Sequence, residues 1–205
     1  MPRSIEPLLH PFAIAALRPT QMTVGYREVA RKRAEWRART LADEPDFLGR
    51  HMIPVVLGPR GHPWLIDNHH LARALHEEGV AHVLVNIVAD LSALERPAFR
   101  TFMDNRNWLH PFDAQGRRQP YGAIPKHIAE LGDDPYRSLA GELRRAGGYA
   151  KDSMPYAEFL WADYLRRHIG VATLGRDFGA AVAAALQLAH TPQASYLPGW
   201  AGPEA

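Results

Sequence analysis

The chain of 205 residues contains no cysteine. Disulfides, thiolate nucleophiles and cysteine-ligated zinc or iron–sulfur sites are therefore excluded, and the composition fits a reducing compartment. No stretch approaches the roughly 18–20 consecutive apolar residues that a membrane helix needs. The segment Met1–Thr20 also lacks the compact apolar core of a signal peptide. We therefore expect a cytoplasmic protein with no membrane partner.

Lysine is also scarce, and Lys32, Lys126 and Lys151 are the only ones. Arginine thus supplies most of the positive charge, but 24 Lys and Arg against 22 Asp and Glu leave a net charge of only +2. A balance this small permits an anionic partner without demanding one. Apolar residues at 46% and charged residues at 22% are ordinary for a globular protein. A disordered chain, a collagen-like fibre and a coiled-coil rod are excluded.

The pattern of expected elements changes near residue 90. Before it, strands and helices alternate, with a loop at 42–50: strand 11–17, helix 23–40, hairpin strands 52–57 and 63–67, helix 69–78 and strand 80–88. After it the pattern is helical, over 91–108, 125–131, 135–146, 156–169 and 174–190. The sequence therefore predicts an α+β fold in three parts: a small mixed-sheet unit at 1–90, a helical subdomain at 91–190 and an extended tail at 191–205.

The segment that joins the second hairpin strand to the next helix carries the most informative polar group. Asp67, Asn68, His69 and His70 follow an apolar strand, and Asn68 and Gly79 are the expected caps of the helix. The first turn of a helix presents unpaired backbone N–H groups and the positive end of the helix dipole, which suit a phosphate. From the residues alone, simple capping with two surface histidines is the alternative.

This segment resembles the signature of the ParB/sulfiredoxin-like superfamily, and the order of elements agrees over roughly residues 10–90. Upstream, the stretch 17–21 (Leu-Arg-Pro-Thr-Gln) is similar to the Pro-x-Gln motif of ParB-like domains. The whole chain, including 133–140 and 158–163, resembles a bacterial family of ParB-like nucleases. In the superfamily the turn cradles nucleotide phosphates. The resemblance therefore implies phosphate contacts from Gln21, Asn68, His69, His70 and Arg73.

Two positions depart from the superfamily pattern. Leu71 stands where the turn ends in arginine, and Arg73 is the nearest basic side chain. Members that phosphorylate free serine carry a glutamate as the base after the first strand, whereas this chain has Gln21, whose amide does not accept a proton at neutral pH. Glu28, on the next expected helix, is the candidate substitute. The candidate catalytic residues are therefore Asp67, His69, His70 and Glu28.

Asp67 is also the candidate metal ligand. The two adjacent histidines point about 100° apart on a helix, so they rarely bind one ion together. Asp67 and a nucleotide phosphate offer the oxygen ligands that Mg²⁺ prefers. The implied cofactors are ATP or ADP, with CTP as an alternative nucleotide, and Mg²⁺.

The helical half offers a second group of candidates. Asp134 followed by Pro135 is typical of a helix start, and Arg137 and Ser138 lie in its first turn. Together with two later residues they form the set of candidate substrate contacts: Arg137, Ser138, Lys151 and Trp161. Capping, helix packing and exposed charge are the alternative explanations. The glycines before Lys151 lack the spacing of a P-loop.

Three functions follow from these observations. The first is a nucleotide- or phosphate-binding enzyme that carries out phosphoryl transfer or hydrolysis on a small molecule with Mg²⁺. The second, less favoured because no convincing helix-turn-helix is present, is a DNA-associated ParB-like nuclease or nucleotide-gated DNA-binding protein. The third is a non-catalytic anion-binding regulatory module, which Gln21 and Leu71 favour.

Overall fold

The computed structural model describes residues 10–39 and 44–203, which form strands, short 3-10 turns and eight α-helices. The predicted α+β class is confirmed. The chain divides into two compact units. Among the described residues, unit 1 comprises 10–22, 30–39, 44–111 and 120–131, and unit 2 comprises 23–29, 112–119 and 132–203.

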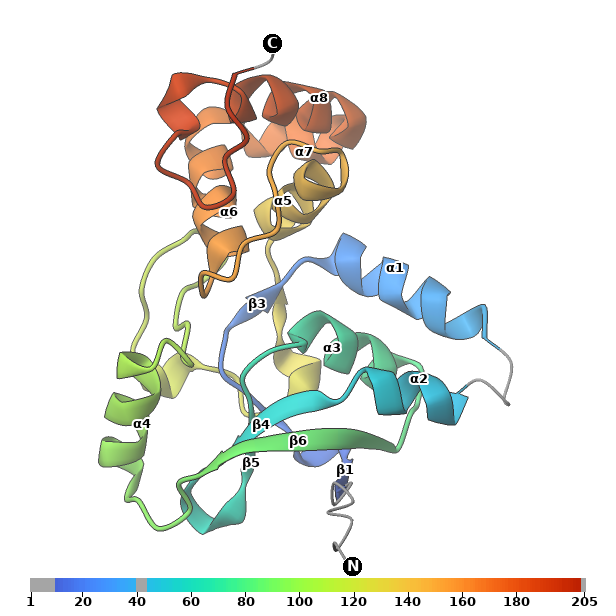
Figure 1. Ribbon diagram of the computed structural model, residues 1–205, viewed down its shortest axis with the longest axis vertical. Coiled ribbons are helices and arrows are strands. Elements are labelled where there is room, and N and C mark those ends of the chain that lie inside the picture. Colours follow the sequence, from blue (N-terminus) through green and yellow to red (C-terminus); the bar gives the residue numbers. More distant parts are fainter. Residues whose placement is uncertain (1–9, 40–43, 204–205) are drawn as a thin grey trace, which may run out of the picture. The chain divides into compact units, whose positions relative to one another are not determined.

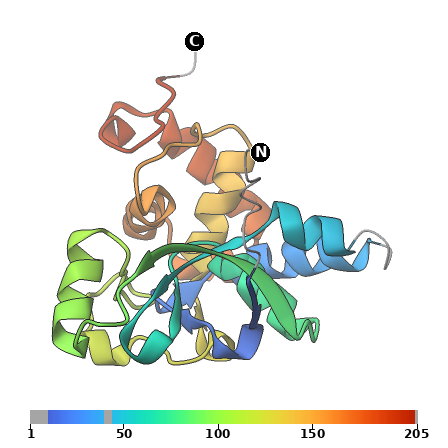
Figure 2. The same cartoon turned by 60° about the horizontal axis from the view of Figure 1, so that its bottom comes forward.

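Unit 1 is built on a five-stranded mixed sheet, which curls along its long strands (Figures 1 and 2). Its strands are, in spatial order, β1 (His10–Ala13), β6 (His82–Asp90), β4 (Ile53–Leu57), β5 (Pro63–Leu65) and β2 (Arg18–Pro19). Strand β6 runs parallel to β4 and antiparallel to β1, while β5 runs antiparallel to β4 and parallel to β2. The predicted β4–β5 hairpin is therefore confirmed, and its 3-10 turn spans Pro59–Gly61.

The helices of unit 1 depart from the prediction in three places. Its helices are α2 (Glu44–Arg50), α3 (His69–Glu77), α4 (Arg96–Asn105) and most of α1 (Tyr26–Arg37). The loop predicted at 42–50 is wrong because α2 places Pro45 in its first turn, where proline is tolerated. Pro97 likewise marks the start of α4, so the helix predicted from residue 91 begins later. The helix predicted at 125–131 is only the 3-10 turn Ile128–Glu130.

Helix α3 packs on the unit 1 core through one face and ends at a glycine. Leu71, Ala72, Ala74 and Leu75 are buried, which is the spacing of an amphipathic helix. Gly79, with φ +75°, ends it in the predicted left-handed conformation.

No described helix has the length and apolar character required to traverse a bilayer.

Unit 2 is mainly helical. Its helices are α5 (Pro135–Arg145), α6 (Ala157–His168), α7 (Val171–Arg176) and α8 (Phe178–Ala189), and a two-stranded parallel ladder joins β3 (Thr23–Val24) to β7 (Gly132–Asp133). Asp134 caps α5 as predicted, accepting the Tyr136 N–H at 2.9 Å. The single helix predicted at 174–190 is interrupted, because Asp177 is extended and caps α8 through the Ala180 N–H at 2.9 Å.

The division into units also differs from the predicted boundary at residue 90. Helix α4 belongs to unit 1, where Phe99 and Met103 pack in one apolar cluster with Val56 and Trp64. Conversely, β3 belongs to unit 2 because its partner is β7. Long-range packing, which no local composition shift records, sets these boundaries.

The tail predicted to be extended is packed against unit 2 up to the last described residues. Leu197 is buried, and the Trp200 indole N–H donates to the carbonyl of Ala189 at 2.8 Å. The carbonyl of Gly199 accepts the Ala150 N–H at 2.8 Å. These apolar and hydrogen-bonded contacts fix the tail, so the extended assignment is wrong for its described part.

Gly199 offers a direct test of this packing. A Cβ at Gly199 would lie 2.1 Å from the carbonyl oxygen of Ala150, at φ +73°. We expect Gly199→Ala to lower the free energy of unfolding by about 2 kcal/mol or more, since strain and clash add. Gly202→Ala is the matched control, because Gly202 has φ +90° and nothing within 4 Å of the added Cβ. Equal losses in thermal denaturation would contradict a packed tail.

Candidate functional site

The turn between β5 and α3 is the centre of the candidate site in unit 1. Asn68 adopts a left-handed conformation, with φ 63° and ψ 27°, which asparagine tolerates better than most residues. It occupies the N-cap position, but its side chain makes no capping hydrogen bond. Instead, the Asp67 carboxylate accepts the Asn68 N–H at 2.7 Å. The expected Asn68 side-chain cap is therefore wrong.

His69 is a structural residue of this turn. Only 4% of it is exposed, and its Nε2 lies 3.2 Å from the backbone N–H of Thr20. Because that N–H donates, Nε2 carries a lone pair and the ring is the neutral Nδ1–H tautomer. The Thr20 hydroxyl donates in turn to the carbonyl of Leu65 at 2.7 Å. Burial places His69 among the groups that hold the turn in position, rather than among exposed contacts.

The remaining unit 1 candidates differ in accessibility. Asp67 is exposed and His70 is half-buried. Gln21 is 6% exposed and forms a parallel bridge with His110. Arg73 pairs with Glu77 at 2.6 Å and donates to the carbonyl of Leu131 at 2.8 Å, which commits its guanidinium to the fold. The surface of the turn is therefore formed by Asp67, Asn68 and His70.

Glu28 lies in unit 2, not in the unit that contains the turn. Its carboxylate binds the guanidinium of Arg145 at 2.6 Å, and Arg145 also binds Glu142 at 2.6 Å. This ion pair holds the Glu28 carboxylate in a contact between α1 and α5. Among the described contacts, Glu28 thus has a structural partner.

Arg137 is the most unusual of the predicted substrate residues. It is 6% exposed, binds Glu158 at 3.1 Å and stacks its guanidinium 3.9 Å from the ring centre of Phe159. Within the described part of the chain, its Nε and Nη1 have no hydrogen-bond partner. Arg144 binds the second oxygen of Glu158 at 2.7 Å. This pair of arginines on one carboxylate joins α5 to α6.

The other three predicted substrate residues do not form one site. Trp161 is fully buried, stacks on Tyr149 at 4.4 Å and donates to the carbonyl of Pro198 at 2.8 Å. Ser138 is buried, and its Oγ accepts the Arg27 N–H at 3.3 Å. Lys151 is exposed. The structure therefore places Trp161 in the packing of unit 2 and Ser138 at the contact between the starts of α5 and α1.

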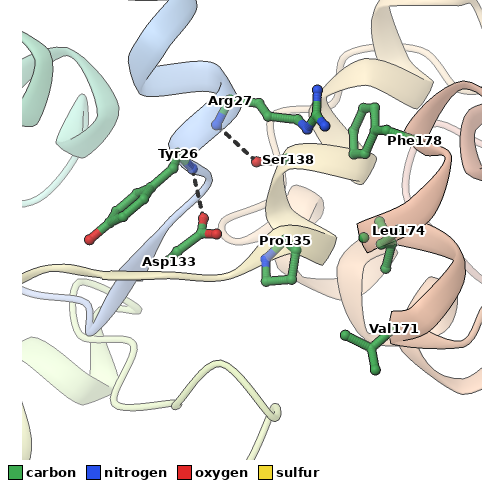
Figure 3. A pocket seen from close by; sticks show the side chains of 9 residues that line it. Tyr26, Arg27, Asp133, Pro135, Ser138, Val171, Leu174 and Phe178 are labelled. Atoms are coloured by element: carbon green, nitrogen blue, oxygen red, sulfur yellow. Dashed lines mark hydrogen bonds between the residues drawn. The ribbon is translucent and has the colours of Figure 1, made fainter.

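A small pocket of about 160 Å³ opens in unit 2, where the starts of α1 and α5 meet α7 and α8 (Figure 3). The guanidinium of Arg27 stacks on Phe178 at 3.8 Å, and Asp133 accepts the Tyr26 N–H at 2.8 Å. The lining of the pocket is largely apolar, with Val171 and Leu174 on the wall opposite Tyr26 and Asp133. Ser138, a predicted substrate contact, lines this pocket, but the sequence did not indicate that three distant segments meet to form it. Its volume falls below the usual range for a nucleotide-sized ligand.

In unit 2 the carboxyl group of Asp134 has a perturbed pKa, which burial explains without a catalytic role. Burial raises the pKa of Asp134 above its ordinary value, although Arg166, whose Nη2 lies 2.6 Å away, acts in the opposite direction. Because the folded-state pKa is the higher one, ionisation of Asp134 lowers the stability of the folded state as pH rises through that pKa. Its role as the cap of α5 accounts for its position.

The described residues do not assemble a metal centre. No three His, Asp or Glu side chains within them come close enough together to hold an ion. Asp67, the predicted Mg²⁺ ligand, would thus act without a second and third protein ligand of this kind. A protein-only Mg²⁺ site does not fit the turn.

Comparisons with known proteins agree with the resemblance seen in the sequence. No curated protein matches the chain. The crystal structure of protein Atu1540 from Agrobacterium tumefaciens is 53% identical, with a TM-score of 0.90 over 97% of this chain and 100% of that one. The model of the family described as "Putative ParB-like nuclease" matches residues 10–167. The chain belongs to this ParB-like nuclease family.

Proposed function

We propose that the protein binds the phosphate groups of a nucleotide at the amino end of α3. The observation that carries the proposal is the left-handed Asn68, whose side chain does not cap the helix. The amino end of a helix favours an external anion through the helix dipole and the backbone N–H groups, and here the N-cap side chain does not compete for that position. The resemblance to the superfamily assigns nucleotide phosphates to this same turn.

In this proposal the two histidines have different tasks. His69 holds the turn through Thr20, so its contribution to binding is indirect. His70, half-buried on the first turn of α3, is the imidazole that donates to a phosphate oxygen. Asp67 is the exposed carboxylate that faces a cation brought in by the nucleotide. Mg²⁺ would be held chiefly by phosphate oxygens and water, as is usual for this ion.

The proposed chemistry is phosphoryl transfer or hydrolysis on a small molecule, within a family named for nuclease activity. Binding is better supported than turnover, because Gln21 is a buried amide and Glu28 is paired with Arg145. Phosphorus NMR of a bound nucleotide over time separates the two cases, since a binding module leaves the nucleotide intact and an enzyme converts it.

The test is thermal unfolding with ATP, ADP, CTP or inorganic phosphate, each with Mg²⁺. A nucleotide at about 100 times its dissociation constant adds roughly 2.7 kcal/mol to the stability of the folded state. We expect at least one nucleotide to raise the melting temperature of the native protein, and His70→Ala to remove most of that increase. The increase should be lost because the variant lacks the imidazole that donates to a phosphate oxygen.

His76→Ala is the matched control, because His76 lies on the last turn of the same helix and is also half-buried. It should keep the full increase. An increase that survives in His70→Ala, or the absence of any increase in the native protein, would contradict the proposed site.

A further inference from the structure

The pocket of unit 2 places a guanidinium group beside an apolar lining. Val171 on α7, Leu174 on α7 and Phe178 on α8 line it, together with Pro135 at the start of α5 (Figure 3). Arg27 supplies the positive charge, because its guanidinium carbon lies 3.8 Å from the ring centre of Phe178. All of these residues belong to unit 2. The pocket therefore combines, within one unit, the two features that bind a small amphipathic molecule.

The guanidinium of Arg27 is held in a position that suits an anion. Among the residues that the structure describes, no acidic side chain forms an ion pair with it. Stacking on the ring of Phe178 leaves the N–H groups at the edge of the guanidinium able to donate hydrogen bonds. Because the ring already restrains the side chain, binding a carboxylate costs little further conformational entropy.

The wall of the pocket that carries Arg27 is fixed on the start of α5. The Asp133 carboxylate accepts the Tyr26 N–H at 2.8 Å, and the Ser138 Oγ accepts the Arg27 N–H at 3.3 Å. Gly25 packs so closely here that a Cβ would lie 2.7 Å from the Ser138 Oγ. These contacts hold the first turn of α1 against α5. The pocket is thus formed by the fold itself, as small-molecule sites usually are.

The size and charge of the pocket define the class of ligand that fits it. Its volume of about 160 Å³ is close to the roughly 150 Å³ of an apolar cavity that binds benzene. A ring-sized apolar group therefore fits. The Asp133 carboxylate lies on the Tyr26 side of the pocket and the Arg27 guanidinium on the Phe178 side (Figure 3). Asp133 would repel a second negative charge on the ligand, which favours a monoanion.

We propose that this pocket binds a small monocarboxylate with a ring-sized apolar body. The apolar body packs against Pro135, Val171 and Leu174, and the carboxylate accepts hydrogen bonds from the guanidinium of Arg27. Apolar burial supplies most of the affinity, and the charged contact fixes the orientation. This site lies in unit 2, whereas the turn before α3 lies in unit 1. The inference goes beyond nucleotide binding, and each site can fail without the other.

A titration with benzoate, followed by proton–nitrogen correlation NMR of the full chain, tests the proposal. We expect benzoate to shift the backbone amide signals of Val171, Leu174 and Gly175, with a dissociation constant of about 1 mM or less. Benzamide has the same ring without the charge and should bind at least about tenfold more weakly. Acetate has the charge without the ring and should leave these signals unchanged up to about 10 mM. Equal binding of benzamide or acetate, or no shift with benzoate at about 10 mM, would overturn the proposal.

Arg27→Gln should weaken benzoate binding about tenfold, because the charged donor is lost. Val171→Asp is a second variant that the fold tolerates, since Val171 is 65% exposed. It replaces part of the apolar wall with a charge that repels the carboxylate, so it should also weaken binding at least about tenfold. A benzoate affinity that neither variant changes would place the ligand elsewhere and contradict the site.

Arg167→Gln is the matched control, because Arg167 is another exposed arginine of unit 2 and does not line the pocket. It should leave the affinity for benzoate within about twofold of the native protein. If Arg167→Gln weakens binding as much as Arg27→Gln, general charge rather than the pocket attracts benzoate. His70→Ala should bind benzoate normally; if it does not, benzoate occupies the turn before α3 and the pocket assignment is wrong.

Discussion

Replacing Trp161 with alanine is expected to lower the free energy of unfolding by about 3–5 kcal/mol. The ring is fully buried, stacks on Tyr149 and donates its N–H to the carbonyl of Pro198. Its removal leaves a cavity in the unit 2 core and an unpaired acceptor, and both effects destabilise the folded state. Chemical denaturation followed by circular dichroism measures this loss.

Leu160→Ala is the control for Trp161, since Leu160 is the neighbouring residue on α6 and is 41% exposed. Its cost should stay below about 1 kcal/mol. A Trp161 variant as stable as the Leu160 variant would rule out the core role and return Trp161 to the substrate contacts that the sequence predicts.

The second large effect is expected for His69→Ala, at about 2–4 kcal/mol of lost stability. The substitution removes a buried ring and leaves the backbone N–H of Thr20 without its acceptor. From the sequence, His69 is a candidate phosphate contact, and its loss would weaken ligand binding alone. The structure instead gives His69 a role in stability, so the melting temperature of the variant is the measurement that tests this prediction.

Two further variants make the His69 result interpretable. His69→Gln retains a side-chain oxygen that can accept a hydrogen bond, so it should recover part of the loss. His76→Ala removes a half-buried imidazole from the same helix and should cost less than about 1 kcal/mol. If His69→Ala proves no less stable than His76→Ala, the bond to Thr20 does not support the turn.

Features set by neighbours in the sequence could be predicted. Asp134 before Pro135 marks the start of α5, and Gly79 marks the end of α3, because caps act on adjacent backbone groups. The β4–β5 hairpin follows from two apolar runs around a glycine-containing turn. In each case, the physical cause lies within a few residues of the feature.

Features set by distant partners could not be predicted. His69 and His70 are adjacent and chemically identical, but only His69 is buried and accepts the backbone N–H of Thr20. Trp161 has the composition of either a packing residue or a ligand contact until Tyr149 is placed beside it.

The pairing of β3 with β7 has a consequence for the synthesis of the protein and for its division into fragments. Thr23 pairs with Gly132, so a strand synthesised early must wait for one synthesised long afterwards. The helical half cannot be expressed from residue 91 onward without losing β3, and the first ninety residues alone would carry that strand unpaired. Both units therefore reach completion only after most of the chain has left the ribosome.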